Sequence, residues 1–331
     1  MLFQAACVLV EEGVLETLES FKGGATVKEL SAKTSFSEYA LGVLLDMAAS
    51  GRIVTFSDDG RYAVTRVGYF LVHDKMTRTN LRFFNDVCYK GMASLSKALH
   101  EGRPAGLSEF NGQWETIYPH LRELPDKARD SWFAWDHLYS DTAFEGAVNA
   151  IAGKFNPGLV YDIGGNTGKF AIKCCSMMKD VRVRIIDLPE QVETAEENIR
   201  KAGLSDRVSF MAADVLKDPK LPGDADIWWM SQFLDCFSPD GIKAILANIR
   251  SSMKDGARVC ILEPLPDRQK FEASSYVINA GSLYFTAMAN GCSRFYRYEV
   301  LAAMIEGCGF KVDETVDGLG ISNSLIICSK A

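Results

Sequence analysis

Apolar residues recur at helical spacing through the first 50 residues and then alternate with polar residues in two short runs. The helical spacing predicts three helices, over residues 1–20, from the capping box that begins at Thr26, and from Ser37 to Ser50. The alternating runs at 52–57 and 61–65 flank a turn at Asp58-Asp59-Gly60 and predict a hairpin. Three helices and a hairpin are typical of a winged-helix domain, which we place at residues 1–75.

Helical segments with clustered aromatic side chains follow over residues 76–140. The aromatic residues are Phe83, Phe84, Tyr89, Trp114, Tyr118, Trp132, Phe133, Trp135 and Tyr139. We expect most of them to pack in the core and a minority to line a pocket for a flat apolar ligand. This part is therefore predicted to be a helical linker that lines the substrate site.

From residue 141 to 331 the pattern changes to short apolar runs separated by segments of helical length. The predicted strands are 159–163, 181–186, 208–212, 226–231, 258–262, 311–316 and 324–328. Strands that alternate with helices are typical of a doubly wound parallel sheet. The last two strands are joined by the short segment 317–320, so we expect them to form an antiparallel pair.

Composition and charge narrow the possible functions. The length of 331 residues indicates two domains, and the net charge of −7 gives no electrostatic footprint for nucleic acid or an anionic membrane. In a winged helix the DNA-reading helix needs basic side chains, but there is no Lys or Arg between Phe36 and Gly51. We therefore predict that this domain serves dimerisation and that the protein has no nucleic-acid partner.

The other composition signals concern membranes, cysteines and metals. The longest uncharged stretch, residues 273–293, carries polar side chains at three- and four-residue steps, which indicates a buried helix rather than a membrane span. Nine cysteines without a C-x-x-C pair predict neither disulfides nor a zinc site and fit a cytoplasmic protein. Acid and histidine spacing predicts no metal site. No capping residue precedes Leu2, so we expect the chain to begin inside its first helix.

The first strand of the predicted sheet ends in the segment Asp162-Ile-Gly-Gly-Asn-Thr-Gly168. Ligands of doubly wound sheets bind beyond the carboxyl ends of the strands. Gly164, Gly165 and Gly168 allow the backbone to approach a ligand and to start a helix whose amides favour an anionic group. A dinucleotide-binding fingerprint would need glycine at position 166, where the chain has Asn166, so NAD is disfavoured.

Two further acids follow the next two strands. Asp187 ends the second strand, where a carboxylate can accept hydrogen bonds from both ribose hydroxyls, and Asp214 follows the third strand near the expected adenine. Three acidic strand ends are more specific than the glycine segment alone. The alternative interpretation is that Asp187 caps the helix from Pro189, that Asp214 only begins a turn, and that Asp162 is a local backbone acceptor.

Motifs along nearly the whole chain match one known family. They are the winged-helix start, Tyr161-Asp-Ile-Gly-Gly-Asn-Thr-Gly168, Ile186-Asp-Leu-Pro189, Ala213-Asp-Val-Leu216, Lys254-Asp-Gly256 before a strand ending at Glu263, and Cys308-Gly-Phe310. On these motifs the chain resembles the class I S-adenosylmethionine-dependent small-molecule O-methyltransferases of the caffeate, acetylserotonin and bacterial polyketide type.

The resemblance implies an α/β fold in which a Rossmann-like domain has a seven-stranded sheet ending in a hairpin, preceded by a mostly helical winged-helix domain. It implies S-adenosyl-L-methionine as cofactor, a small-molecule acceptor and a homodimer formed through the N-terminal domain. The cofactor site that it implies comprises Gly164 and Gly165 at the amino-acid end, Asp187 and Leu188 at the ribose, Asp214 and Val215 at the adenine, and also Asp162, Gly168 and Ser231.

The chain departs from this family at the catalytic base. The family's histidine, in a Leu-His-Asp-Trp-Ser segment after the fourth strand, corresponds to Asp235 in Leu234-Asp-Cys-Phe-Ser238. Of the two acids that flank this base in the family, the first matches Glu263 and the second falls at Ser293. No histidine follows His137 in the sequence.

Three hypotheses for the base remain open. In the first, Asp235 is the base, and its burial raises its pKa from the usual value of about 3.9. In the second, the acceptor is already acidic and needs no base. In the third, His137 reaches the site from the linker helix. The alternatives are that Asp235 belongs to a plain turn before the helix that begins at Ser238, and that His137 is a surface or interface residue.

The predicted function is O-methylation of a small, aromatic, hydroxylated or acidic acceptor, in which Asp235, Glu263 and His137 are the candidate catalytic residues. One alternative is a family member that uses S-adenosylmethionine for decarboxylation or hydroxylation. Another is a non-catalytic dimeric regulator on the same scaffold, and an NAD oxidoreductase is the weakest.

Overall fold

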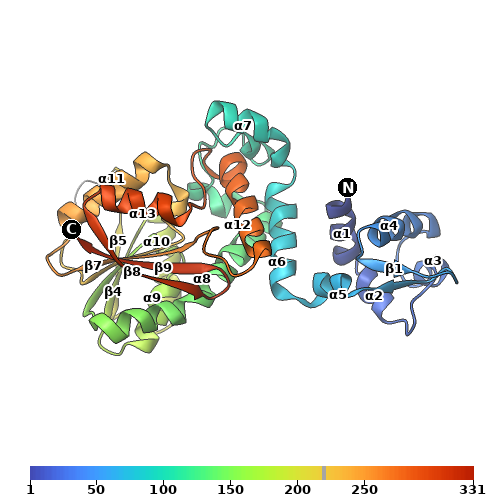
Figure 1. Ribbon diagram of the computed structural model, residues 1–331, viewed down its shortest axis with the longest axis horizontal. Helices are drawn as coiled ribbons and strands as arrows, with labels where there is room; N and C mark the ends of the chain where they lie inside the picture. Colours follow the sequence, from blue (N-terminus) through green and yellow to red (C-terminus); the bar gives the residue numbers. More distant parts are fainter. Residues whose placement is uncertain (218–220) are drawn as a thin grey trace. The chain divides into compact units, whose positions relative to one another are not determined.

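The computed structural model describes residues 1–217 and 221–331 and divides into two compact units. The first unit comprises Met1–Tyr89 and Asp126–Trp135, and the second comprises Lys90–Pro125 and Asp136–Ala331. Figure 1 shows both units and labels most of their helices and strands. No helix in the described ranges has the length and apolar character needed to cross a membrane.

The first unit consists of helices and one small hairpin (Figure 1). Its elements are α1 (Leu2–Glu11), α2 (Val14–Glu19), α3 (Val27–Ser31), α4 (Glu38–Ser50), β1 (Val54–Phe56), β2 (Tyr62–Val64), α5 (Arg66–His73), α6 (Lys75–Phe83), a π-helical turn (Phe84–Cys88) and the start of α8 (Asp126–Phe155). The capping box at Thr26 is confirmed, because Thr26 and Glu29 satisfy each other's backbone N–H groups. The single helix expected over residues 1–20 is wrong: Gly13 adopts a left-handed φ of 67°, which ends α1 and starts α2.

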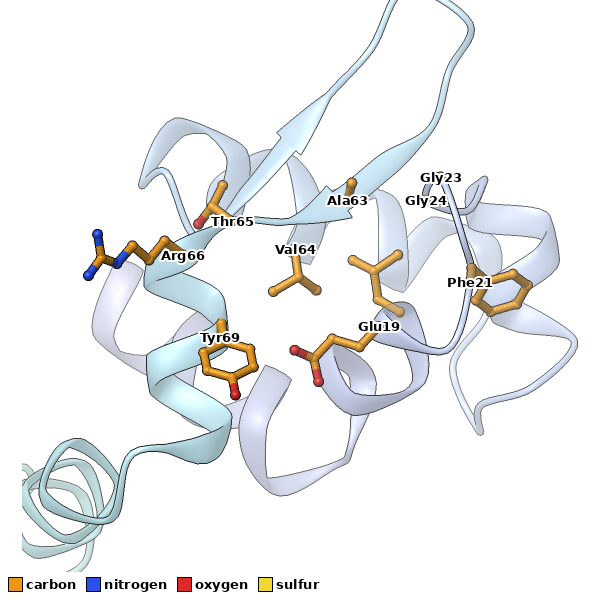
Figure 2. A pocket seen from close by; sticks show the side chains of 10 residues that line it. Glu19, Phe21, Gly23, Gly24, Ala63, Val64, Thr65, Arg66 and Tyr69 are labelled. Atoms are coloured by element: carbon orange, nitrogen blue, oxygen red, sulfur yellow. The ribbon is translucent and has the colours of Figure 1, made fainter.

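A cavity of about 360 Å³ opens between α2, β2 and α5 in this unit. Figure 2 shows the Glu19 carboxylate directed toward the Tyr69 side chain, and Val64 forms part of the cavity wall. None of the residues that the sequence analysis assigned to a catalytic or cofactor site lines this cavity. All of those residues lie in the second unit.

The second unit is built on a seven-stranded sheet with the order β5-β4-β3-β6-β7-β9-β8. Its strands are β3 (Leu159–Ile163), β4 (Arg182–Asp187), β5 (Val208–Ala212), β6 (Ile227–Ser231), β7 (Arg258–Pro264), β8 (Phe310–Leu319) and β9 (Asn323–Lys330). The first five strands run parallel, and β9 pairs antiparallel with both β7 and β8. The predicted doubly wound sheet with a final hairpin is thereby confirmed.

Helices cover both faces of this sheet because successive strand residues point to opposite sides. On one face, Tyr161 and Ile163 of β3 pack with buried residues of α11 and α13; on the other, Val160 packs with α8, α9 and α10. The helices of the unit are the main part of α8, α7 (Leu95–Glu101), α9 (Lys169–Met177), α10 (Pro189–Lys201), α11 (Pro239–Ser252), α12 (Glu272–Tyr284) and α13 (Tyr298–Gly307), with shorter helical turns at 91–94, 105–109, 118–123, 234–236 and 285–289. Covering both faces leaves the carboxyl ends of the strands as the open edge for a ligand.

Two local expectations differ from the structure. The turn of the final hairpin lies at residues 320–322 rather than 317–320, because β8 continues through Leu319 with register shifts that absorb the extra residues. The stretch at 273–293 is not one buried helix. It forms α12 and a π-helical turn that ends at Ala289, and Tyr276 and Leu283 are exposed.

Candidate functional site

The glycine segment after β3 turns the chain sharply at the carboxyl end of the central strand. Gly164 and Gly168 adopt left-handed φ values of 72° and 79°, and the Gly164 N–H donates to the carbonyl of Ile186 on β4 at 2.9 Å. A Cβ atom at Gly164 would overlap the ring of Phe233, which follows β6. The segment therefore needs glycine there, both for its backbone conformation and for its contact with the next loop.

Asp162 lies beneath this segment and is almost fully buried, with 2% of its surface exposed. Its Oδ2 has no hydrogen-bond partner among the described residues, and a Cβ atom at Gly165 would approach that oxygen to 2.8 Å. Burial, and secondarily the charge of Asp187, raise the pKa of Asp162 to about 8. Its carboxyl group is thus held in a site that favours the protonated form unless a donor or cation arrives.

Asp187 ends β4 and is tied to the glycine segment. Its Oδ2 accepts the backbone N–H of Asn166 at 2.8 Å, and its Oδ1 accepts the N–H of Leu188 at 2.7 Å. Burial raises the pKa of Asp187 to about 6, although these two N–H groups oppose the shift. The N-cap of α10 is Leu188 and has no side-chain cap, so Asp187 does not cap that helix.

The remaining predicted cofactor residues lie after β5 and at the end of β6. Asp214 accepts the N–H of Leu216 at 3.0 Å and pairs with Lys217, so it begins a turn, while Val215 is buried in the core. Ser231 is the last residue of β6, and its Oγ is buried without a hydrogen-bond partner in the described part of the chain. All of these residues therefore lie at the carboxyl edge of the sheet.

Asp235 and Glu263 come together as a buried carboxyl pair. Glu263 on β7 accepts the N–H groups of Phe233 and Leu234 at 3.0 and 2.9 Å through Oε1, and its other oxygen is left for Asp235. Burial and the charge of Asp235 raise the pKa of Glu263 well above its usual value, whereas burial raises that of Asp235 only to about 6. Burial and the mutual repulsion of the two carboxyl groups therefore disfavour the state in which both are ionised.

His137 is placed on α8, facing the glycine segment. Its Nε2 lies 3.3 Å from the Oγ1 of Thr167. Burial and the nearby charge of Lys169 lower the pKa of His137 to about 4, so the imidazole is neutral at physiological pH. The structure thus brings His137 to the glycine segment, while Asp235 and Glu263 come from the ends of the neighbouring strands.

Sequence reasoning missed Asp136, Asn166 and Asn290 as residues of this site. The Asp136 carboxylate accepts a hydrogen bond from the Asn166 side chain at 3.2 Å. The Asn290 side chain donates to the carbonyl of Cys236 at 2.6 Å and accepts from the Ser293 hydroxyl at 2.8 Å. Position 293, where the family has its second acid, therefore contributes a hydroxyl group that is bound to Asn290. Asn166 stood within the glycine segment, but no sequence spacing indicated that Asp136 approaches Asn166 or that Asn290 approaches Cys236.

Comparison with known proteins decides the family. A model of the O-methyltransferase domain matches residues 146–311, which is half of the chain, and a model of the Dimerisation2-like domain matches residues 1–62. The chain belongs to the O-methyltransferase family. It is therefore an S-adenosylmethionine-dependent methyltransferase.

Individual relatives agree with this assignment. The methyltransferase is 25% identical over 314 residues to 3-amino-4-hydroxybenzoate 4-O-methyltransferase of Streptomyces cremeus, covering 94% of this chain and 82% of the relative. Its fold is similar to that of the mitomycin 7-O-methyltransferase MmcR, with a TM-score of 0.75, 21% identity and 100% and 94% coverage. It is also similar to that of human N-acetylserotonin methyltransferase in complex with S-adenosylmethionine, with a TM-score of 0.66, 21% identity and 99% and 94% coverage.

The charges of the site fit this methyl donor. Asp136, Asp162, Asp187, Asp235 and Glu263 all have raised pKa values because they are desolvated. Among the described cations only Lys169 counteracts this, and it does so at Asp136. Buried carboxyl groups without basic partners are costly to ionise. A ligand that carries a sulfonium and an ammonium group supplies the missing positive charge.

Proposed function

We propose that the methyltransferase transfers a methyl group to the hydroxyl oxygen of a small aromatic acceptor, with Asp235 as the general base. The observation that carries the proposal is the buried pair formed by Asp235 and Glu263, in which burial and mutual repulsion disfavour ionisation of both carboxyl groups together. A carboxylate held in this way can accept one proton from an acceptor.

The donor site that we propose comprises the residues of the strand ends and the glycine segment. They are Asp162, Gly164, Gly165, Gly168, Asp187, Leu188, Asp214, Val215 and Ser231. When bound there, S-adenosylmethionine supplies an electrophilic methyl group on a positively charged sulfur. The acids of the site favour that charge, and the glycines leave room for the backbone to approach the donor.

The proton of the acceptor has to leave as its oxygen becomes an ether. A phenol has a pKa near 10, about four units above that of Asp235, so full transfer before methylation would cost about 5 kcal/mol. We therefore place the proton transfer in the methylation step, in which the acidity of the oxygen rises as the new C–O bond forms. Glu263 and the Cys236 thiol, which lies 3.3 Å from Asp235 Oδ1, hold the base by hydrogen bonds.

The linker segment 76–140 is proposed to line the acceptor site. The Tyr118 hydroxyl is buried in the charge field of Asp235 and beside Cys236, and burial raises its pKa well above the usual value. An aromatic hydroxyl next to the base can orient the acceptor's ring and oxygen. Relatives named for hydroxybenzoate and acetylserotonin support a small aromatic acceptor.

The test is methyl transfer to a panel of small phenols and hydroxybenzoates that includes 3-amino-4-hydroxybenzoate. Asp235→Asn is expected to lower kcat by about 10²- to 10⁴-fold, the usual contribution of a general base. The wild-type rate should rise with pH through about 6 as Asp235 ionises and then level off. Glu263→Gln retains a hydrogen-bond donor for Asp235 and is expected to lose less than about tenfold.

Asp240→Asn is the matched control, because Asp240 lies in the first turn of α11 on the surface and forms an ion pair with Lys243. An unchanged rate in Asp235→Asn would remove Asp235 from the mechanism. A loss in His137→Ala alone would assign the base to His137. If both variants keep the wild-type rate, the acceptor enters the reaction already ionised.

Residues 1–75 are proposed to form a homodimer, and residues 141–331 to bind the donor. The match of residues 1–62 to a dimerisation domain supports this, as do the exposed apolar side chains of Tyr39, Val43 and Phe56. Sedimentation analysis tests the dimer. We further propose a cytoplasmic enzyme without nucleic-acid or membrane partners, which is consistent with nine cysteines that are all free thiols.

A further inference from the structure

Asp136 contacts the glycine segment at residues 162–168 and lies in the charge field of Asp235. It is on α8, and its Oδ2 accepts the side-chain amide of Asn166 at 3.2 Å. The backbone N–H of the same Asn166 donates to Asp187 at 2.8 Å. One residue of the glycine segment, held in a left-handed conformation with φ of 48°, therefore connects two carboxylates from different elements.

The groups that face Asp136 come from four elements. Burial raises its pKa to about 7, and the charges of Asp235 and Asp141 act in the same direction. Lys169 and the Asn166 amide oppose the shift. Lys169 is already paired with Asp141 at 2.6 Å, so its charge is shared between two acids. Asp136 thus lacks a cation of its own among the described residues.

Two other side-chain oxygens at this edge of the sheet also lack a hydrogen-bond donor among the described residues. The Oδ2 of Asp162 is buried and has no hydrogen-bond donor within the described ranges, and the Asp162 side chain is 2% exposed. The Oδ1 of Asn166 is buried without a partner as well. The unsatisfied oxygens of Asn166, which contacts Asp136, and of Asp162, which begins the same glycine segment, indicate that a ligand with positive charge and N–H groups completes the site.

We propose that Asp136 recognises the charge of the methyl donor, so that the site prefers the cationic S-adenosylmethionine to the neutral thioether S-adenosylhomocysteine. The inference rests on the proposed donor site and extends it to a residue outside the strand ends. Donor binding stabilises the ionised Asp136 carboxylate, and the proton that it carried leaves to solvent. After methyl transfer the sulfur is neutral, the carboxylate loses its partner, and it regains a proton as the product departs.

The consequence is a difference in pH dependence between the two ligands. Donor binding requires ionised Asp136, so its affinity should rise with pH up to about 7 and then level off. The product has no sulfonium, and its affinity should change less over the same range. Asp136 therefore lowers product inhibition by binding the donor more strongly than the product.

Isothermal titration calorimetry of the full chain with each ligand at pH 6, 7 and 8 tests the proposal. Repeating the titrations in two buffers of different ionisation enthalpy counts the protons released. For Asp136→Asn we expect about tenfold weaker donor binding at pH 8, which corresponds to a shift of about one unit in the pKa of Asp136 when the donor binds. Product binding should become less than about threefold weaker. The proton released by the wild-type protein should no longer appear.

Two further variants complete the experiment. Glu145→Gln on the same helix is the control, because Glu145 is largely exposed and pairs with Lys173 on the surface. Asp136→Glu keeps the charge and should restore the preference for the donor. Equal loss of both ligands in Asp136→Asn, or unchanged proton release, would show that Asp136 only positions Asn166 and would overturn the proposal. Because no acceptor is present, the result is independent of whether Asp235 is the base.

Discussion

The buried carboxyl group of Asp162 makes a specific prediction about stability. Its pKa is about 8 in the folded protein, against about 3.9 in an unfolded chain, so the folded state favours the protonated form. The sign follows from linkage: a raised acid pKa contributes stability at low pH that is lost as pH rises toward the folded value. Asp162→Asn removes this group and should therefore become more stable relative to wild type as pH rises.

The magnitude follows from the pH interval over which the folded acid resists ionisation. From pH 5.5 to about 8 the interval is about 2.5 units, and at about 1.36 kcal/mol per unit the wild-type protein loses about 3 kcal/mol. The new amide leaves a buried donor unpaired, which costs about 1–3 kcal/mol at every pH. That cost cancels when the variant's change in unfolding free energy at pH 5.5 is subtracted from its change at pH 8.5.

The assay is urea denaturation of the ligand-free protein at both pH values, followed by circular dichroism and tryptophan fluorescence. Asp240→Asn is the control substitution, because Asp240 is exposed at the start of α11. A difference below about 1 kcal/mol between the two pH values would show that Asp162 ionises normally in the folded state. The argument from its burial and its unpartnered oxygen would then be wrong.

Two further substitutions probe the backbone of the second unit, one at the site and one at the amino ends of β4 and β5. Gly164→Ala is expected to destabilise the protein by about 1–3 kcal/mol and to weaken donor binding, because φ is 72° and the new Cβ overlaps Phe233. The control is Gly153→Ala, where a Cβ atom meets open space, and it should have neither effect. Arg207→Lys should lower the free energy of unfolding, measured by urea denaturation, by about 1–3 kcal/mol. One ammonium group cannot replace the hydrogen bonds of the guanidinium to the carbonyls of Cys175, Met178 and Val181. An equal effect of the surface substitution Arg200→Lys would contradict this.

Much of the fold could be predicted because it depends on local patterns. The strand over Leu159–Ile163 was placed correctly, since an apolar run before a glycine segment defines both where a buried strand lies and where it ends. The helix expected over residues 1–20 failed at Gly13, a signal that was present in the sequence and was not used. The final turn failed because register shifts in β8 follow its pairing with β9 rather than any local residue preference.

One part of the candidate site could also be predicted from sequence patterns, and another part could not. The sequence alone determined that Asp162, Gly164 and Asp187 lie at strand ends, because residues after parallel strands meet at one edge of the sheet. Only the tertiary structure decided that Asp235 and Glu263 are buried as a pair and that Asp136 reaches Asn166. Periodicity encodes which face of an element is buried, whereas the approach of side chains from separate elements, and the desolvation that shifts their pKa values, arise only when those elements pack.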